Sequence, residues 1–308
     1  MYMNGPDSEE GRLGDGRFNP GAWKTGEVLR VLVREVNGPA KPGMPDCGKM
    51  IYVELEDGRC TEQRRVWSPG DEIASLEDAR ASVAPTGLVV VGLTAVYRVD
   101  GRFEPHPAIV TLESNEKMGR LPRIQVLDVQ GKNTTPLGII DKGLIAYRPE
   151  NDGSCLRVVH VDDGGSVHSE GRIDLSRSLP LWGEVKLGTA SPPFWVNEHQ
   201  ALMPVHGISR DDNGMLVYSI GLSRLEYGRG AFEVYVDPDP LLTRGDFEGW
   251  PQLHPEERWA MYSTGGYLET RDGVEYLCLL VSVGDCRTVV RKWPMKELEE
   301  RVKMNSKH

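Results

Sequence analysis

Short runs of β-forming residues follow one another along the chain and limit what it can fold into. They have the alternating or continuous apolar patterns of strands and lie at 28–36, 49–55, 87–98, 107–112, 123–129, 143–148, 155–161, 200–206, 215–223, 231–236, 258–267, 274–283 and 286–292. Only 294–303, which Pro294 opens, has the pattern of a helix. The sequence therefore predicts an all-β protein with one short C-terminal helix.

Tight turns join these runs. Five segments place an Asp or Asn close to a glycine, which supplies the positive φ of a hairpin; they are EDGR at 56–59, VDGR at 99–102, NDGS at 151–154, DDNG at 211–214 and RDGV at 271–274. Such hairpins join antiparallel strands, whereas a βαβ protein needs long helical crossovers. The favoured architecture is a β-propeller, and a two-sheet sandwich is the alternative.

Length and composition fit one large β domain. Of the 308 residues, 39% are hydrophobic and 27% are charged, so a sizeable core can be buried. We expect the polar, glycine-rich residues 1–15 to form a flexible tail and residues 16–308 to form a single propeller domain that ends in the short helix.

The formal net charge of -10 argues against a surface for nucleic acid or anionic membrane, although it leaves room for one local cationic pocket. The five cysteines have no CxxC spacing and are odd in number, so they support neither a zinc site nor a disulfide framework. No apolar stretch reaches about 18 residues, and the N-terminal residues lack the hydrophobic core of a signal peptide. We expect a cytoplasmic protein without a metal ion.

The stretch from Trp182 to Ile208 contains residue types suited to binding an anion. Lys186 is a compact cation, the double proline at 192–193 fixes a loop, and His206 follows an apolar run. The plainer interpretation is a solvated lysine and a structural histidine, which single residues of these types usually are.

Three further patches place charged residues at the ends of apolar runs; they are LEDAR at 76–80, YRPE at 147–150 and VGDCR at 283–287. Taken alone, the first is a solvated turn, the second an edge-strand terminus and the third a turn formed by its aspartate. None of the three indicates a function by itself.

Their order along the chain adds information. The ordered motifs are FNPGA at 18–22, VLVRE at 31–35, LEDAR at 76–80, GKNTTP at 131–136, GLIAYRP at 143–149, IDLSRSLPLW at 173–182, KLGTASPP at 186–193 and VHG at 205–207. Together they resemble the pattern of glycoside hydrolase family 130, which comprises β-mannoside phosphorylases and related mannosidases. The resemblance extends from about Phe18 to Val290.

The resemblance implies a five-bladed β-propeller with a central pocket and an inverting cleavage of a β-mannosidic bond. Asp78 stands at the position of the general acid, whose proton reaches the leaving oxygen through the mannose 3-hydroxyl in family phosphorylases. The positions that hold inorganic phosphate, a co-substrate, correspond to Arg148, Lys186 and His206. Pocket positions that contact sugar or phosphate correspond to Asn19, Arg34, Arg80 and Asp285. No other cofactor is implied, and a homo-oligomer is compatible with the family.

The sequence departs from the family pattern at several pocket positions. Ala79 replaces a proline in the Glu-Asp-Pro-Arg motif, and Val205 stands where a tyrosine precedes His-Gly. Residues 200–202 replace Gly-Trp-Leu, and LLVSVGD at 279–285 replaces a Tyr-Tyr-Gly-Ala-Ala-Asp strand. Because lost aromatic rings remove stacking surface for a sugar, we expect a divergent substrate specificity.

Three functional hypotheses follow. The preferred one is phosphorolysis, in which a β-mannoside oligosaccharide and phosphate give mannose 1-phosphate and a shortened sugar, because the sequence supplies an Arg, a Lys and a His for a dianion. A β-mannosidase that uses water would need a second carboxylate, for which Glu198 and Glu226 are candidates. The third hypothesis is a propeller that binds glycans without catalysis.

Overall fold

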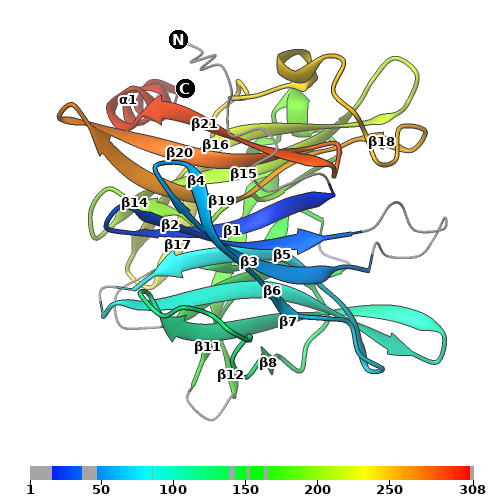
Figure 1. The fold of residues 1–308 in the computed structure, drawn as a ribbon. Helices are drawn as coiled ribbons and strands as arrows, with labels where there is room; N and C mark the ends of the chain where they lie inside the picture. The colour runs from blue at the N-terminus through cyan, green and yellow to red at the C-terminus, as the bar shows by residue number, and fades with distance from the viewer. Residues whose placement is uncertain are drawn as a thin grey trace.

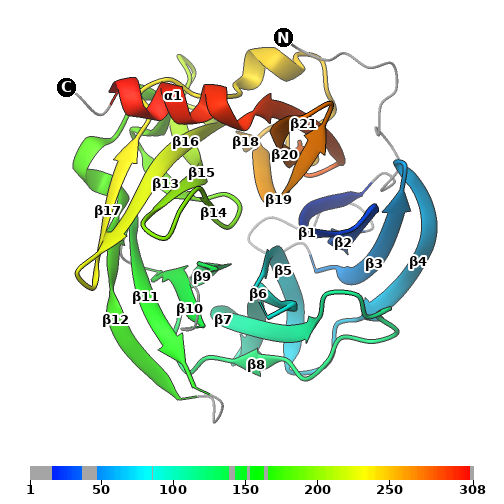
Figure 2. The ribbon, with the colours of Figure 1, turned by 90° about the vertical axis from the view of Figure 1, so that its left-hand side faces the viewer.

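Five sheets of antiparallel strands, one of which also includes a short parallel strand, stand around a common centre in a five-bladed β-propeller, as the view along the axis shows (Figures 1 and 2). The computed structural model describes residues 16–36, 47–84, 86–138, 143–150, 153–162 and 166–305. The strands of each sheet are consecutive in the chain, so the all-β propeller prediction is confirmed and the two-sheet sandwich was wrong. The tail predicted at 1–15 lies outside the described residues.

The first three blades each have four strands. Blade I contains β1 (Arg17–Thr25), β2 (Val28–Glu35), β3 (Lys49–Glu56) and β4 (Arg59–Trp67). Blade II contains β5 (Ile73–Val83), β6 (Leu88–Val99), β7 (Arg102–Glu113) and β8 (Gln125–Val126). Blade III contains β9 (Lys132–Pro136), β10 (Leu144–Arg148), β11 (Cys155–Val161) and β12 (Val167–Asp174).

The last two blades differ from this plan. Blade IV contains β13 (Lys186–Thr189), β15 (Gln200–Arg210), β16 (Leu216–Gly228) and β17 (Ala231–Val236), with the short β14 (Phe194–Trp195) and β18 (Arg258–Trp259) added. Blade V contains β19 (Met261–Arg271), β20 (Val274–Val283) and β21 (Arg287–Pro294). Short 3-10 turns lie at Leu175–Ser178, Leu181–Gly183 and Arg244–Phe247.

The predicted C-terminal helix is present as α1 (Met295–Asn305), which follows β21 directly. Its apolar residues Met295, Leu298 and Val302 are buried in the cluster between blades IV and V (Figure 2). Within the described part of the chain, no helix combines the length and the apolar character needed to cross a bilayer.

Each pair of neighbouring blades encloses an apolar cluster. The I–II cluster includes Trp23 and Leu76, and the IV–V cluster includes Ile220 and Leu279. Smaller clusters fill the II–III, III–IV and V–I interfaces. Because the middle strands are covered by a blade on each side, their sequences are continuous apolar runs, which is why the sequence predicted β2, β6, β16 and β20 well.

Hydrogen bonds between blades I and V close the ring. The Asn19 amide donates to Ser282 Oγ at 2.7 Å, Thr264 Oγ1 donates to the Pro20 carbonyl at 3.2 Å, and Thr288 Oγ1 donates to the Arg17 carbonyl at 3.2 Å. These bonds, with the V–I cluster, hold the first strand of the ring against its last sheet.

The blades approach so closely here that a side chain does not fit at one position. A Cβ atom on Gly265 of β19 would lie 2.2 Å from the Pro20 carbonyl oxygen, and the obstacle is backbone, which cannot move aside. We therefore expect Gly265→Ala to lower the free energy of unfolding by about 2 kcal/mol or more. Chemical denaturation measures this. Gly228→Ala in β16, where nothing lies within 4 Å, is the matched control and should leave stability nearly unchanged; equal losses in both variants would contradict the tight I–V contact.

Candidate active site

The innermost strands of four blades carry β-bulges near the centre of the ring. Register shifts fall between Phe18 and Gly21 in blade I, between Glu77 and Arg80 in blade II, opposite Ala146–Arg148 in blade III, and between Tyr262 and Gly265 in blade V. A bulge redirects the side chains that it carries and is frequent next to active sites. The bulges point to the centre of the ring as the functional site.

The bulges of blades I, II and III each contain a residue in the left-handed region, which costs energy for a residue with a Cβ. The residues are Asn19 with φ 52°, Asp78 with φ 55° and Asn133 with φ 58°. In hairpin turns, Asp57, Asp100, Arg229 and Asp272 adopt similar angles next to a glycine, where turn formation accounts for them. No turn accounts for the three central residues, so their strain indicates a functional constraint.

Asp78 is partly exposed and held from two sides. Asn19 Nδ2 donates to Asp78 Oδ1 at 2.8 Å, and the Arg80 guanidinium donates to the Asp78 backbone carbonyl at 2.9 Å. Because Oδ1 accepts from an amide, it is the poorer of the two oxygens for carrying a proton. Oδ2 is therefore the oxygen from which Asp78 can donate.

Arg80 is fully buried and links blade II to blade IV. Its Nε donates to the Ala190 carbonyl at 2.7 Å and its second NH2 group to the Thr189 carbonyl at 3.3 Å. Burial, opposed by Asp78 and assisted by nearby Arg148, lowers the pKa of Arg80 to about 10. Arg80 therefore donates hydrogen bonds to backbone carbonyl groups, and its predicted contact with a ligand stays a prediction.

The three side chains predicted to hold an anion lie together. Gly188 pairs with His206 across β13 and β15, and a Cβ on this glycine would lie 2.7 Å from the imidazole, so glycine makes room for the ring. Burial, together with Arg148 and Lys132, lowers the pKa of Lys186 to about 8. Burial and then Arg148 and Arg80 hold the pKa of His206 well below its usual value. Mutual repulsion of this kind requires that the cations be close neighbours.

This cluster of positive charge has no internal counter-ion. Among the described residues, neither Arg148 nor Lys186 forms an ion pair, and Arg148 Nε is buried without a hydrogen-bond partner. Asp78 lies near enough to oppose the lowering of the Arg148 pKa that burial causes. An unneutralised cationic group in a chain of net charge -10 is suited to an anionic ligand.

His206 has a defined tautomer when neutral. Its Nδ1 lies 3.0 Å from the Thr189 carbonyl, so Nδ1–H donates there and Nε2 is left as an acceptor. Because the pKa of His206 is held well below 6.5, the neutral form dominates near pH 7. Nε2 can therefore accept a hydrogen bond from the hydroxyl of hydrogen phosphate.

Aromatic rings that sequence reasoning missed lie beside this histidine. Tyr262 of β19 contacts His206 edge-on with ring centroids 5.3 Å apart, and Tyr218 of β16 lies 4.9 Å from Tyr262. Burial, Tyr218 and Asp285 raise the pKa of Tyr262 well above its usual value, so it stays a neutral hydroxyl. Tyr262 and Tyr218 thus provide aromatic surface near the site, although Val205 replaces the tyrosine of the family motif. The apolar pattern around these two tyrosines predicted strands and gave no sign of a role in the site.

The remaining predicted pocket residues form ion pairs around the centre. Arg34 donates to Glu77 Oε1 at 3.0 Å, and Asp285, 5% exposed, accepts from Arg258 at 3.1 Å. Burial raises the pKa of Asp285, against the effect of Arg258. Among the described residues, no three His, Cys, Asp or Glu side chains gather as metal ligands.

The carboxylates proposed for a water-using enzyme lie elsewhere. Glu198 is exposed in a loop. Glu226 accepts from Gln200 Nε2 at 2.9 Å and pairs with Arg224 at 3.1 Å. Glu226 pairs with Gln200 at the start of β15. His206 lies six residues further along this strand, which is a distance of roughly 20 Å. Their assignment to the pocket was wrong, because both belong to the far end of blade IV.

Comparisons with known proteins identify the fold. No family model matches the sequence, and no curated protein is detectably similar to it. A glycosyl hydrolase from Bacteroides ovatus superposes with a TM-score of 0.63 at 14% identity, covering 92% of this chain and 85% of that one. A candidate glycosidase from Bacteroides thetaiotaomicron gives 0.62 at 15% identity, covering 92% and 88%.

A third solved structure comes from the family that the sequence motifs resemble. It belongs to the GH130 family of mannoside phosphorylases, described as containing glycoside hydrolases that target β-1,2 mannosidic linkages in Candida mannan. It superposes with a TM-score of 0.61 at 14% identity, covering 92% of this chain and 85% of that one. The chain therefore has the five-bladed propeller fold of these carbohydrate-active enzymes.

The unpaired cations predict that phosphate stabilises the protein. At a phosphate concentration of 100 Kd we expect about 2.7 kcal/mol of added stability, or roughly 5 °C in Tm. Lys186→Met should lose most of this shift yet be at least as stable as the native chain without phosphate, since it removes one member of a repelling cluster. Lys296→Met on the exposed side of α1 is the control. Differential scanning calorimetry with and without phosphate measures both effects, and a shift retained in Lys186→Met would contradict the site.

The pKa of Lys186 predicts how anion binding varies with pH. With a pKa of about 8, Lys186 is charged below pH 8 and loses its proton above it, while hydrogen phosphate remains a dianion. Phosphate affinity should therefore be constant from pH 7 to 8 and then fall up to about tenfold per pH unit. Lys186→Arg should remove the fall, because guanidinium stays charged. Isothermal titration calorimetry from pH 7 to 9.5 distinguishes these outcomes.

Proposed function

We propose that this chain is an inverting β-mannoside phosphorylase, a divergent member of glycoside hydrolase family 130. The observation that carries the proposal is the group of Arg148, Lys186 and His206, which has no carboxylate partner among the described residues and lies beside the partly exposed Asp78. A nucleophilic dianion needs such a group, and an attacking water does not. The neighbouring structures support a carbohydrate substrate through the activities in their names.

The proposed reaction needs one acid and no base. A phosphate oxygen attacks the anomeric carbon of the mannosyl unit as the bond from that carbon to the bridging oxygen breaks, with inversion. The bridging oxygen takes the electron pair and a proton, which originates on Asp78 Oδ2 and passes through the mannose 3-hydroxyl. Mannose 1-phosphate and a shortened saccharide leave, and Asp78 regains a proton from solvent.

The phosphate holders have separate tasks in this scheme. Arg148 offers a planar fork for two phosphate oxygens, and Lys186 offers a point charge. His206 Nε2 accepts a hydrogen bond from the phosphate hydroxyl, so it favours the monoprotonated dianion. Binding of the dianion raises the pKa of Lys186 toward its usual value, which keeps the lysine charged through the reaction.

Hydrolysis by an inverting route would need a second carboxylate free to activate water. The other carboxylates near the centre are engaged, since Glu77 pairs with Arg34 and Asp285 with Arg258. A paired carboxylate is a weak base for water, so this arrangement favours phosphate as the nucleophile.

The test is a reaction with β-mannobioses in the presence and absence of phosphate. We expect mannose 1-phosphate, with a rate that depends on phosphate. Asp78→Asn should lower kcat by about 10²- to 10⁴-fold, the usual contribution of a general acid. Glu198→Gln, an exposed carboxylate, is the matched control and should retain full activity. Free mannose formed without phosphate would favour hydrolysis, and no effect of Asp78→Asn on any turnover would favour a binding propeller.

A further inference from the structure

A cavity of about 470 Å³ lies over blades IV and V, outside the cluster described above. Its lining includes Met215, Arg244, Trp250, Gln252, Arg258 and Trp259, and we call it the Trp250 cavity. It is on the same face as the candidate active site, since Arg258 of β18 donates to Asp285 in the turn after β20. Asp285 in turn lies close enough to Asp78 for the two charges to interact.

Two residues that line this cavity, Gln252 and Arg258, each have a buried N–H donor without an acceptor. Gln252 Oε1 accepts from the Ala260 amide at 3.0 Å, which fixes the side chain and leaves its buried Nε2 without a partner. Arg258 donates to Asp285 through one NH2 group, while its buried Nε has none. Buried donors without acceptors cost free energy, which a ligand oxygen could recover after a small turn of the side chain toward the cavity.

The cavity also has aromatic surface. Trp250 is partly exposed and meets Phe247 edge-on with ring centroids 5.2 Å apart, so its orientation is fixed before any ligand binds. The indole face of Trp250 is suited to the apolar C–H face of a pyranose. The neighbouring amide of Gln252 and guanidinium of Arg258 are suited to the hydroxyl groups of the same sugar.

The charges of the cavity indicate an uncharged ligand. Arg258 is neutralised by Asp285, and Arg244 lies 3.4 Å from Asp211. The cavity therefore differs from the central cluster, where Arg148 and Lys186 have no counter-ion among the described residues. A neutral polyol meets these requirements better than a phosphate or a carboxylate.

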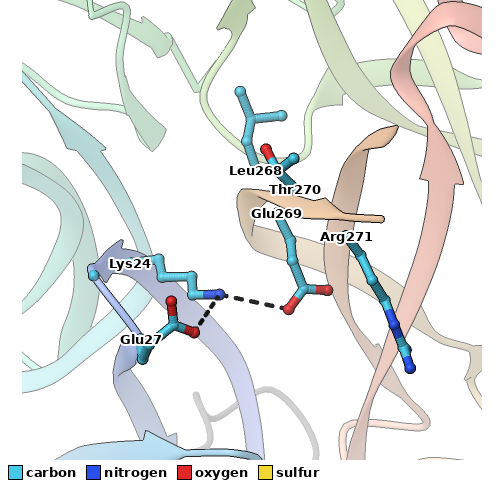
Figure 3. A pocket seen from close by; sticks show the side chains of 7 residues that line it. Lys24, Glu27, Leu268, Glu269, Thr270 and Arg271 are labelled. Atoms are coloured by element: carbon cyan, nitrogen blue, oxygen red, sulfur yellow. Dashed lines mark hydrogen bonds and ion pairs between the residues drawn. The ribbon is translucent and has the colours of Figure 1, made fainter. Parts of the chain in front are cut away.

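A second cavity, of about 490 Å³, serves as a contrast (Figure 3). Residues at the C-terminal ends of β1 and β19, away from the bulges in these strands, line this cavity. Lys24 points between Glu27 and Glu269, and Lys292 lies 2.6 Å from Glu269. Its described lining has no aromatic ring, and its lysine and glutamates are already paired. It lacks the features that recommend the Trp250 cavity.

We infer that the Trp250 cavity binds the leaving saccharide, a neutral pyranose, through Trp250, Gln252 and Arg258. The inference rests on the proposed function and names its aglycone site. The Arg258–Asp285 ion pair connects the two regions, because Arg258 lines the cavity and Asp285 lies close to Asp78. The substrate then spans from the central cluster, which holds the mannosyl unit and phosphate, to the Trp250 cavity.

The test compares Trp250→Ala, Trp250→Phe and Gln252→Glu with the native chain. Calorimetric titration with β-mannobioses of different linkage, without phosphate, measures saccharide binding independently of turnover. We expect Trp250→Ala to raise Kd at least about tenfold and Trp250→Phe to recover part of the loss. Gln252→Glu keeps the acceptor for the Ala260 amide but removes the free donors, so it should also weaken binding. The phosphate-induced shift in Tm should persist in all three variants and shows that they are folded.

The outcomes separate the two proposals. No mannobiose binding by the native chain, or unaltered Kd in Trp250→Ala and Gln252→Glu, would overturn the aglycone site while leaving phosphorolysis to be judged by its own assay. Weakened binding in the variants of a protein that shows no phosphate-dependent cleavage would support the saccharide site and refute the phosphorylase. If both hold, the KM for a sugar acceptor in the reverse reaction should rise in Trp250→Ala, with the KM for mannose 1-phosphate unchanged.

Discussion

Positive charge concentrated at the centre of the ring is the constraint on which the rest of the site depends. Arg148, Lys186 and His206 come from two blades; burial lowers the pKa of each, and the charge of Arg148 lowers the pKa values of Lys186 and His206 further. They stay together because the scaffold is rigid: Arg80 ties blade II to the Thr189–Ala190 backbone, and Thr189 also fixes the His206 ring. The cationic cluster costs stability locally, and a bound anion would recover it.

The distribution of counter-ions decides which anion-using chemistry is favoured. Around the centre, Glu77 and Asp285 each have an arginine, and Asp78 has an amide donor. Arg148 and Lys186 have no carboxylate among the described residues. One acid that can give up a proton, beside cations that lack partners, suits a reaction in which the second substrate brings the negative charge.

The sequence predicted the middle strands and missed most inner ones, for a physical reason. Middle strands such as β6 and β20 are buried on both faces and read as apolar runs. The inner strands β1, β5 and β9 were absent from the prediction because polar residues and bulges break their two-residue period. The exposed strands β4 and β12 were missed because they are polar. The propeller could still be predicted from its hairpins, because the glycine of each of the five predicted turns has the expected positive φ; they are Gly58, Gly101, Gly153, Gly214 and Gly273. The central residues came from the family resemblance, which included the motif around Asn133 without giving that residue a role. Tyr262 and Arg258 were missed, since their positions depend on register and bulges that period-two patterns do not show.

The hydrogen-bonded join between the first and last blades has a consequence for dynamics. No covalent or sheet connection crosses it in the described residues, so this join depends on its hydrogen bonds and on the V–I apolar cluster. Asn19 lies on that join, with its backbone amide on Ser282 and its side chain on Asp78. Asn19 thus links the last blade, through its backbone, to the proposed proton donor, through its side chain, so loss of the bond to Ser282 would leave the amide that holds Asp78 less firmly placed.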